Sequence, residues 1–119
     1  MNSKVYDPLL TELVQKSKQK GLKWTATDLP NQVLLGFEES ALSLRHEREA
    51  GDPVLILTIH NLQGEVLAST LYTEEHLSWK SVLKLYLAAQ KQIAGIDLVL
   101  ERMISELKRP GEIGRSPRS

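Results

Sequence analysis

The feature of the sequence that restricts the fold most is a long helical repeat in its C-terminal third. Apolar residues recur there at intervals that alternate between three and four without a break: Trp79, Val82, Tyr86, Ala89, Ile93, Ile96, Leu100, Met103 and Leu107. This heptad spacing keeps the side chains on one face of an α-helix. Gly95 falls inside the segment, but the heptad phase passes through it undisturbed. We therefore predict one continuous helix from about 78 to 108.

This helix is longer than a small sheet needs. At 1.5 Å per residue it would extend over about 45 Å, whereas a strand of six residues spans about 20 Å. Its near half would pack on the sheet, and its far half would meet a partner helix or a second copy. The residues predicted to make that contact are Ile93, Ile96, Leu100, Met103 and Leu107. The alternative is that the whole seam lies across the chain's own sheet.

The positions beside the seam are apolar too. They are Leu83, Leu85, Val99 and Ile104. In a two-stranded coiled coil these flanking positions usually carry charges that pair across the interface. The wide apolar face therefore argues against a simple two-stranded zipper.

The rest of the chain predicts a short helix followed by an antiparallel sheet. Asp7 as N-cap and Pro8 as first residue favour a helix from 8 to 20, with Gly21 closing it in the left-handed conformation. Alternating polarity, a strongly hydrophobic run at 54–59 and turn residues predict strands at 22–27, 33–38, 41–49, 54–59 and 65–72. The second and third of these are either separate strands or one bent strand. The predicted fold class is α+β, with a short N-terminal helix, an antiparallel β-meander of four to five strands and a long C-terminal helix packed on the sheet.

Both faces of the predicted central strand are apolar. Leu55, Leu57 and Ile59 occupy one face, and Val54 and Ile56 occupy the other. Both faces are then expected to be covered, at least locally. If the two predicted helices share one face, the other face needs a second subunit or a partner.

Size and composition favour a single small domain. The 119 residues suffice for one hydrophobic core, which we place in 1–108, followed by a disordered basic tail at 109–119. Fifteen basic residues balance fifteen acidic ones, so no overall field attracts nucleic acid or an anionic membrane. The chain has no cysteine, and no segment reads as a secretory leader or a membrane span. We expect a cytoplasmic protein.

No pattern of catalytic or metal-binding residues stands out. His46, His60 and His76 fall in different predicted elements and lack the spacing of a helical metal site. Glutamates at 38 and 39 are neighbours in a strand and point to opposite faces, and those at 47 and 49 lie in a charged, solvated stretch. We therefore expect a protein that is not an enzyme, with no catalytic residues, no metal and no cofactor.

Two alternatives from other function classes remain open. One is a ligand-binding or enzymatic domain, with a pocket between the sheet and the long helix lined by Trp24, Phe37 and Tyr86. The other is a nucleic-acid-binding module that uses a basic strip beside one aromatic residue. Its residues would be Lys16, Lys18, Lys20, Lys23 and Trp24, with Arg45, Arg48, Arg109, Arg115 and Arg118 in support.

The apolar seam extends beyond the predicted sheet, and the sequence shows no catalytic pattern. Together these two observations favour a non-catalytic module. We expect a small cytoplasmic protein that mediates protein–protein interaction or regulation. Its partner is expected to be a second copy, bound through the long helix, an exposed sheet face or both, or else another protein. Binding to a membrane is not expected.

Overall fold

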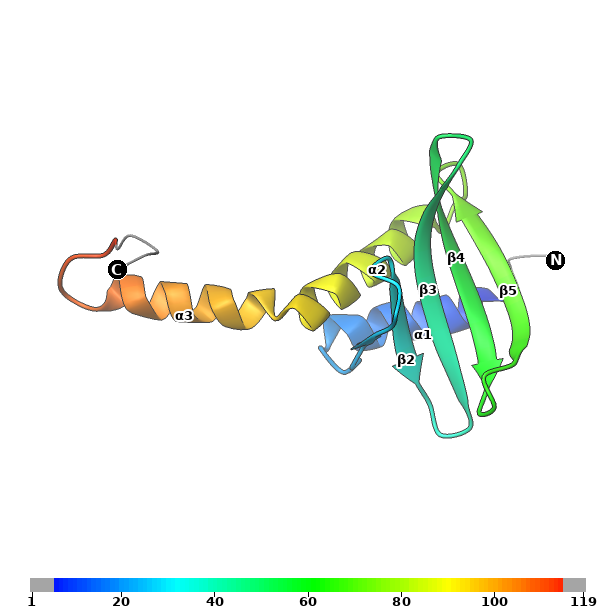
Figure 1. Cartoon of the computed structure of the whole chain (residues 1–119), viewed down its shortest axis with the longest axis horizontal. Helices are drawn as coiled ribbons and strands as arrows, with labels where there is room; N and C mark the ends of the chain where they lie inside the picture. The colour runs from blue at the N-terminus through cyan, green and yellow to red at the C-terminus, as the bar shows by residue number, and fades with distance from the viewer. Residues whose placement is uncertain (1–5, 115–119) are drawn as a thin grey trace.

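The computed structural model describes residues 6–114, apart from the side chains of residues 96 and 97. Three helices and one five-stranded antiparallel sheet form an α+β fold, which confirms the predicted class (Figure 1). The elements are α1 (Asp7–Lys18), β1 (Thr25–Ala26), β2 (Gln32–Gly36), β3 (Ser40–Glu49), β4 (Asp52–Asn61), β5 (Val66–Thr73), α2 (Trp79–Ala94) and α3 (Ile96–Lys108). The strands follow each other in the sheet in sequence order, as a meander does.

The predicted segments 33–38 and 41–49 form two separate strands and not one bent strand. β2 and β3 form a hairpin whose register runs from Gln32 opposite Arg45 to Gly36 opposite Ala41. The Phe37 N–H donates to the Ser40 carbonyl oxygen at 2.8 Å and closes the turn. β1 is much shorter than the predicted 22–27, because the Trp24 N–H donates to a side chain of α2 instead of a strand.

A tight two-residue turn joins β3 to β4. Glu49 pairs with Asp52, and between them Ala50 and Gly51 have φ angles of +50° and +87°. Two positive φ angles are typical of the type I′ turn, whose twist matches that of the flanking strands. Asparagine and glycine adopt this backbone readily, whereas alanine is strained in it.

Replacing Ala50 with asparagine is therefore expected to stabilise the fold by about 1 kcal/mol. Chemical denaturation with urea measures this as a higher midpoint at an unchanged slope. Gly51→Ala serves as the control of opposite sign, because it places a Cβ on a residue with a φ of +87°. An Ala50→Asn variant with the midpoint of the wild type would show that the turn is not strained.

The C-terminus of α1 differs from the prediction that Gly21 closes the helix in the left-handed conformation. The residue in the left-handed conformation is Lys20, with a φ of +56°, and Gly21 is not in that conformation. The Gly21 N–H donates to the Lys16 carbonyl oxygen and the Lys20 N–H to that of Ser17, at 3.0 Å each. This is a Schellman motif with lysine where glycine is usual. A Cβ at residue 21 would lie 2.8 Å from the Lys16 side chain, so this glycine permits a close approach. The N-terminus is shifted as well, because Asp7 is the first helical residue and Tyr6 holds the N-cap position.

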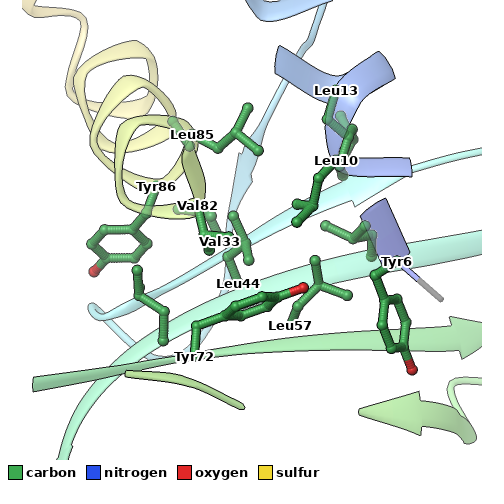
Figure 2. Close-up of a cluster of buried hydrophobic side chains, with 14 of the residues drawn as sticks. Tyr6, Leu10, Leu13, Val33, Leu44, Leu57, Tyr72, Val82, Leu85 and Tyr86 are labelled. Atoms are coloured by element: carbon green, nitrogen blue, oxygen red, sulfur yellow. The ribbon is translucent and has the colours of Figure 1, made fainter. Parts of the chain in front are cut away.

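The hydrophobic core lies on one face of the sheet, beneath α1 and α2. Figure 2 shows Leu10 and Leu13 from α1, and Val82 and Leu85 from α2, above side chains of the strands. The strand residues in this cluster all belong to the alternating phase that faces the helices: Val33, Leu35, Leu42, Leu44, Leu55, Leu57 and Tyr72. Both helices therefore share one face of the sheet.

The other face of the sheet carries no helix in the described part of the chain. It holds the opposite phase, which mixes Leu34, Ile56 and Leu71 with Thr58 and Ser69. Val54 also lies on this phase, and it is buried although it stands outside the core cluster. An antiparallel sheet commonly has one packed face and one solvated face, and this mixture of apolar and hydroxyl side chains fits that arrangement.

The predicted continuous helix is wrong at Gly95. The helix ends at Ala94 and a new one begins at Ile96, with Gly95 between them at a φ of +68°. The Gly95 N–H donates to the Gln92 carbonyl oxygen at 3.2 Å and ends α2 in a left-handed cap. Glycine adopts this backbone without a Cβ penalty, and the heptad pattern of side chains carries no signal of it. α3 therefore points away from the body, which gives a molecule of 59 × 36 × 26 Å (Figure 1).

Candidate interaction surface

α3 displays its apolar side chains to solvent. Five of them are between 46% and 68% exposed: Val99, Leu100, Met103, Ile104 and Leu107. Beyond its junction with α2, the helix makes no extensive contact with any other helix or strand that the structure describes. These five residues are called the apolar arc of α3 below.

The apolar arc is continuous around the helix. At 3.6 residues per turn its five residues span about 140° of the circumference. The remainder of the surface carries Glu101, Arg102, Ser105, Glu106 and Lys108, with Leu98 among them opposite the arc. A helix with this division ordinarily lies with its apolar side against another surface.

The five residues predicted to bind a partner fall on both sides of the break. Ile93 belongs to α2 and is partly buried against the core, so it is part of the body of the protein. Leu100, Met103 and Leu107 lie in the apolar arc. Ile96 begins α3, and its side chain is outside what the structure describes. The far part of the predicted seam is thus the exposed part.

A shallow apolar groove lies on the body of the protein, between α1 and the end of β2. It has a volume of about 540 Å³. Its apolar walls come from α1, from the segment before β1 and from β2 with the residue that follows it: Leu9, Leu13, Leu22, Leu35 and Phe37. Glu12, Lys16 and Lys23 are the charged residues along it. These residues are called the α1–β2 groove below.

The end of α2 is fastened next to this groove. The Gln92 side chain donates from Nε2 to the Leu22 carbonyl oxygen at 2.8 Å and accepts the Trp24 N–H at 2.5 Å. One side-chain amide thus makes two hydrogen bonds, one as donor and one as acceptor. Together they fix the position of the last turn of α2 on the segment before β1. α3 therefore leaves the body close to the α1–β2 groove.

The aromatic residues predicted to line one pocket lie apart. Phe37 is 47% exposed at the α1–β2 groove, whereas Trp24 is buried beside the end of α2. Tyr86 is buried as well, stacked on His46 with ring centroids 5.7 Å apart. Phe37 and Trp24 line two different pockets, and Tyr86 lines neither of them.

The histidines lie in three different environments. His46 stacks on Tyr86, and His76 Nδ1 accepts the Ser78 N–H at 2.9 Å. His60 Nε2 lies 3.0 Å from the Ser43 hydroxyl on the face of the sheet away from the helices. Among the side chains that the structure describes, no group of three His, Asp or Glu gathers as a metal site would require.

The Ser43–His60 pair was not foreseen from the sequence, because the two residues lie on neighbouring strands and register alone brings them together. The Ser43 side chain is buried, with only 2% of the residue exposed. A serine nucleophile needs access to its substrate. The pair therefore acts as a structural hydrogen bond.

The predicted basic strip is present, but its aromatic residue is covered. Lys16, Lys18, Lys20 and Lys23 are exposed around the end of α1. Trp24 is only 6% exposed, so its ring is not presented for stacking on a base. Arg45 pairs with Glu47 at 2.9 Å, and Arg115 and Arg118 lie outside the described residues. Residues 109–114 of the predicted tail form neither helix nor strand.

Comparison of the chain with protein-family models, with curated protein sequences and with solved structures found no match. None of the three helices in residues 6–114 has the length and apolar character needed to cross a bilayer.

Proposed function

We propose that this protein is a non-catalytic, cytoplasmic interaction module that forms a homodimer through α3. The observation that carries the proposal is the apolar arc, whose five large side chains are exposed on a helix that leaves the body. Monomeric proteins rarely expose contiguous apolar surface of this kind unless it binds something.

The short length of α3 and its lack of packing on the body also support a partner. α3 has 13 residues, and an isolated helix of that length is marginal in water. Most helical stability in proteins comes from packing of an apolar face, and the apolar arc is not packed on the body. A partner that covers the arc supplies the missing contact.

The charges of α3 favour a protein partner over a membrane surface. Helices that lie on membranes are rich in lysine and arginine on their polar side. The polar side of α3 mixes both signs, with Glu101 and Glu106 beside Arg102 and Lys108. Such a mixture suits specific pairing with a protein surface.

The width of the apolar arc also bears on the kind of contact. A two-stranded coiled coil uses a narrow seam of two positions in seven. The arc includes Val99 and Ile104 on its shoulders and is therefore broader than that seam. It fits better against a groove or between several elements than against one other helix.

Sedimentation velocity on the full chain tests the proposal. The double variant Leu100→Asp/Met103→Asp is expected to weaken self-association by at least about 100-fold, because each carboxylate would be buried in the contact. Circular dichroism should show that the sheet remains folded, since both side chains are about half exposed.

Leu98→Asp is the matched control. Leu98 lies on the same helix and is 52% exposed, but it points away from the apolar arc. This variant is expected to sediment like the wild type. Equal effects of the two substitutions would contradict a specific role for the arc, and loss of the sheet in the double variant would show that the arc belongs to the monomer core.

A further inference from the structure

We infer that the apolar arc of α3 docks in the α1–β2 groove of a second copy, so that two chains exchange their C-terminal helices. This inference rests on the proposed function and names the surface that receives α3. Both parts of the contact are on the same chain, and none of the described residues covers either of them: an exposed apolar helix, and an apolar groove of about 540 Å³.

The charges beside the two surfaces are complementary. Lys16 and Lys23 lie along the groove, and Glu101 and Glu106 flank the apolar arc on its two sides. Glu106 also pairs with Arg109 of its own chain at 3.5 Å, on the exposed surface. Glu12 of the groove likewise has Lys108 as an available counterpart. Complementary charges around an apolar contact direct a helix into one orientation and exclude other partners.

The connection at Gly95 favours docking on another chain over docking on the same one. A single residue separates α2 from α3. Antiparallel helix pairs need a loop of about two to five residues, so α3 cannot fold back along the body without unwinding. The groove of a second copy has no such restriction.

The position of the groove suits a symmetric exchange. Gln92 holds the end of α2 against Leu22 and Trp24, and Leu22 also lines the groove. Each α3 therefore begins next to its own groove. Two copies related by a two-fold axis can each lay α3 in the groove of the other, and the same contact is then made twice.

Disulfide trapping tests the inference directly, because the chain has no cysteine of its own. Phe37→Cys is mixed with a second variant that carries Leu100→Cys, Met103→Cys or Leu107→Cys, and the mixture is oxidised gently. A mixed disulfide between the two variants is expected for at least one of the three positions, since a disulfide forms only when the Cα atoms come within about 7 Å. Leu98→Cys, on the opposite side of α3, is the matched control and should remain unlinked.

A binding measurement gives an independent test. Phe37→Asp is expected to weaken the dimer at least about tenfold, because Phe37 forms part of the groove wall. Leu77→Asp is the control: Leu77 is fully exposed between β5 and α2, at the end of the sheet opposite Phe37, and its substitution should leave the dimer unchanged.

Five results would overturn the inference, and together they separate it from the proposed function. A dimer that yields no mixed disulfide at any of the three positions would contradict docking in the groove but not the proposed function. A dimer that is insensitive to Phe37→Asp would do the same. Predominant linkage of one Met103→Cys chain to another would show α3 paired with α3. A disulfide formed within a single chain of the Phe37→Cys/Met103→Cys double variant would show docking on the same copy. A wild-type monomer would reject both proposals.

Discussion

Replacing Leu57 with alanine is expected to lower the free energy of unfolding by about 3 to 4 kcal/mol. Leu57 lies in the middle of β4 with an exposure of 0%, between the sheet and the two helices that cover it. Truncating a buried leucine removes its transfer free energy and leaves a cavity that the surroundings fill only in part. Urea denaturation monitored by tryptophan fluorescence measures the loss, since Trp24 and Trp79 belong to the same core.

Ile56 provides the control for Leu57. It is the preceding residue of the same strand and points to the face that no helix covers. Ile56→Ala is expected to cost only about 1 kcal/mol, because less of its surface is buried. Equal losses at the two positions would contradict a core on one face of the sheet.

Replacing Tyr72 with phenylalanine is expected to stabilise the protein by about 1 kcal/mol at neutral pH. Tyr72 is 0% exposed, and its hydroxyl has no hydrogen-bond partner among the described residues. A buried hydroxyl without a partner loses its hydration and gains nothing in return, whereas phenylalanine keeps the ring contacts in the core. These contacts include the edge of His76, with centroids 4.8 Å apart.

The stabilising effect of Tyr72→Phe should grow in alkali. Burial raises the pKa of Tyr72 to about 12 from 10.0, with further contributions from Asp7 and Tyr6. Above pH 10 the unfolded chain releases this proton and the folded chain retains it, so the stability of the wild type falls as the pH rises towards 12. Below pH 10 the Tyr72 phenol is protonated in both the folded and the unfolded chain, so it makes the free energy of unfolding depend little on pH there. Between about pH 10 and pH 11 the advantage of the variant should increase by about 1 kcal/mol.

Urea denaturation of both proteins at neutral and alkaline pH measures this difference. Tyr86→Phe is the control of opposite sign, because the Tyr86 hydroxyl accepts a hydrogen bond from Gln90 Nε2 at 2.8 Å. Its removal is expected to cost about 1 kcal/mol at neutral pH. A Tyr72→Phe variant that is less stable than the wild type would show that the Tyr72 hydroxyl is paired in solution.

The sequence predicted those parts of the fold that follow from local periodicity. The hydrophobic run at 54–59 and the turn residues around Gly51 predicted β4 and its hairpin, because strand pairing over short loops is local. The heptad residues from Trp79 to Ala89 do form the side of α2 that packs on the core. Side-chain periodicity, however, describes which face is apolar and not what covers it.

The parts that sequence could not predict depend on backbone conformation and on contacts between distant residues. Gly95 keeps the heptad phase while its φ of +68° ends the helix, so the pattern and the backbone disagree at this residue. The α1–β2 groove needs Leu9, Leu22 and Phe37 side by side, and the fixed end of α2 needs Gln92 next to Trp24. Neither arrangement leaves a trace in spacing along the chain. The apolar shoulders Val99 and Ile104 were visible in the sequence, but the α1–β2 groove was not.

Sedimentation equilibrium of the full chain at high micromolar concentration tests most directly whether α3 joins two copies. The mass of one chain is 13.4 kDa, so the dimer has twice that, 26.8 kDa. We predict 26.8 kDa for the wild type and 13.4 kDa for the Leu100→Asp/Met103→Asp variant under the same conditions. A wild-type mass of 13.4 kDa at every concentration would contradict self-association through the apolar arc.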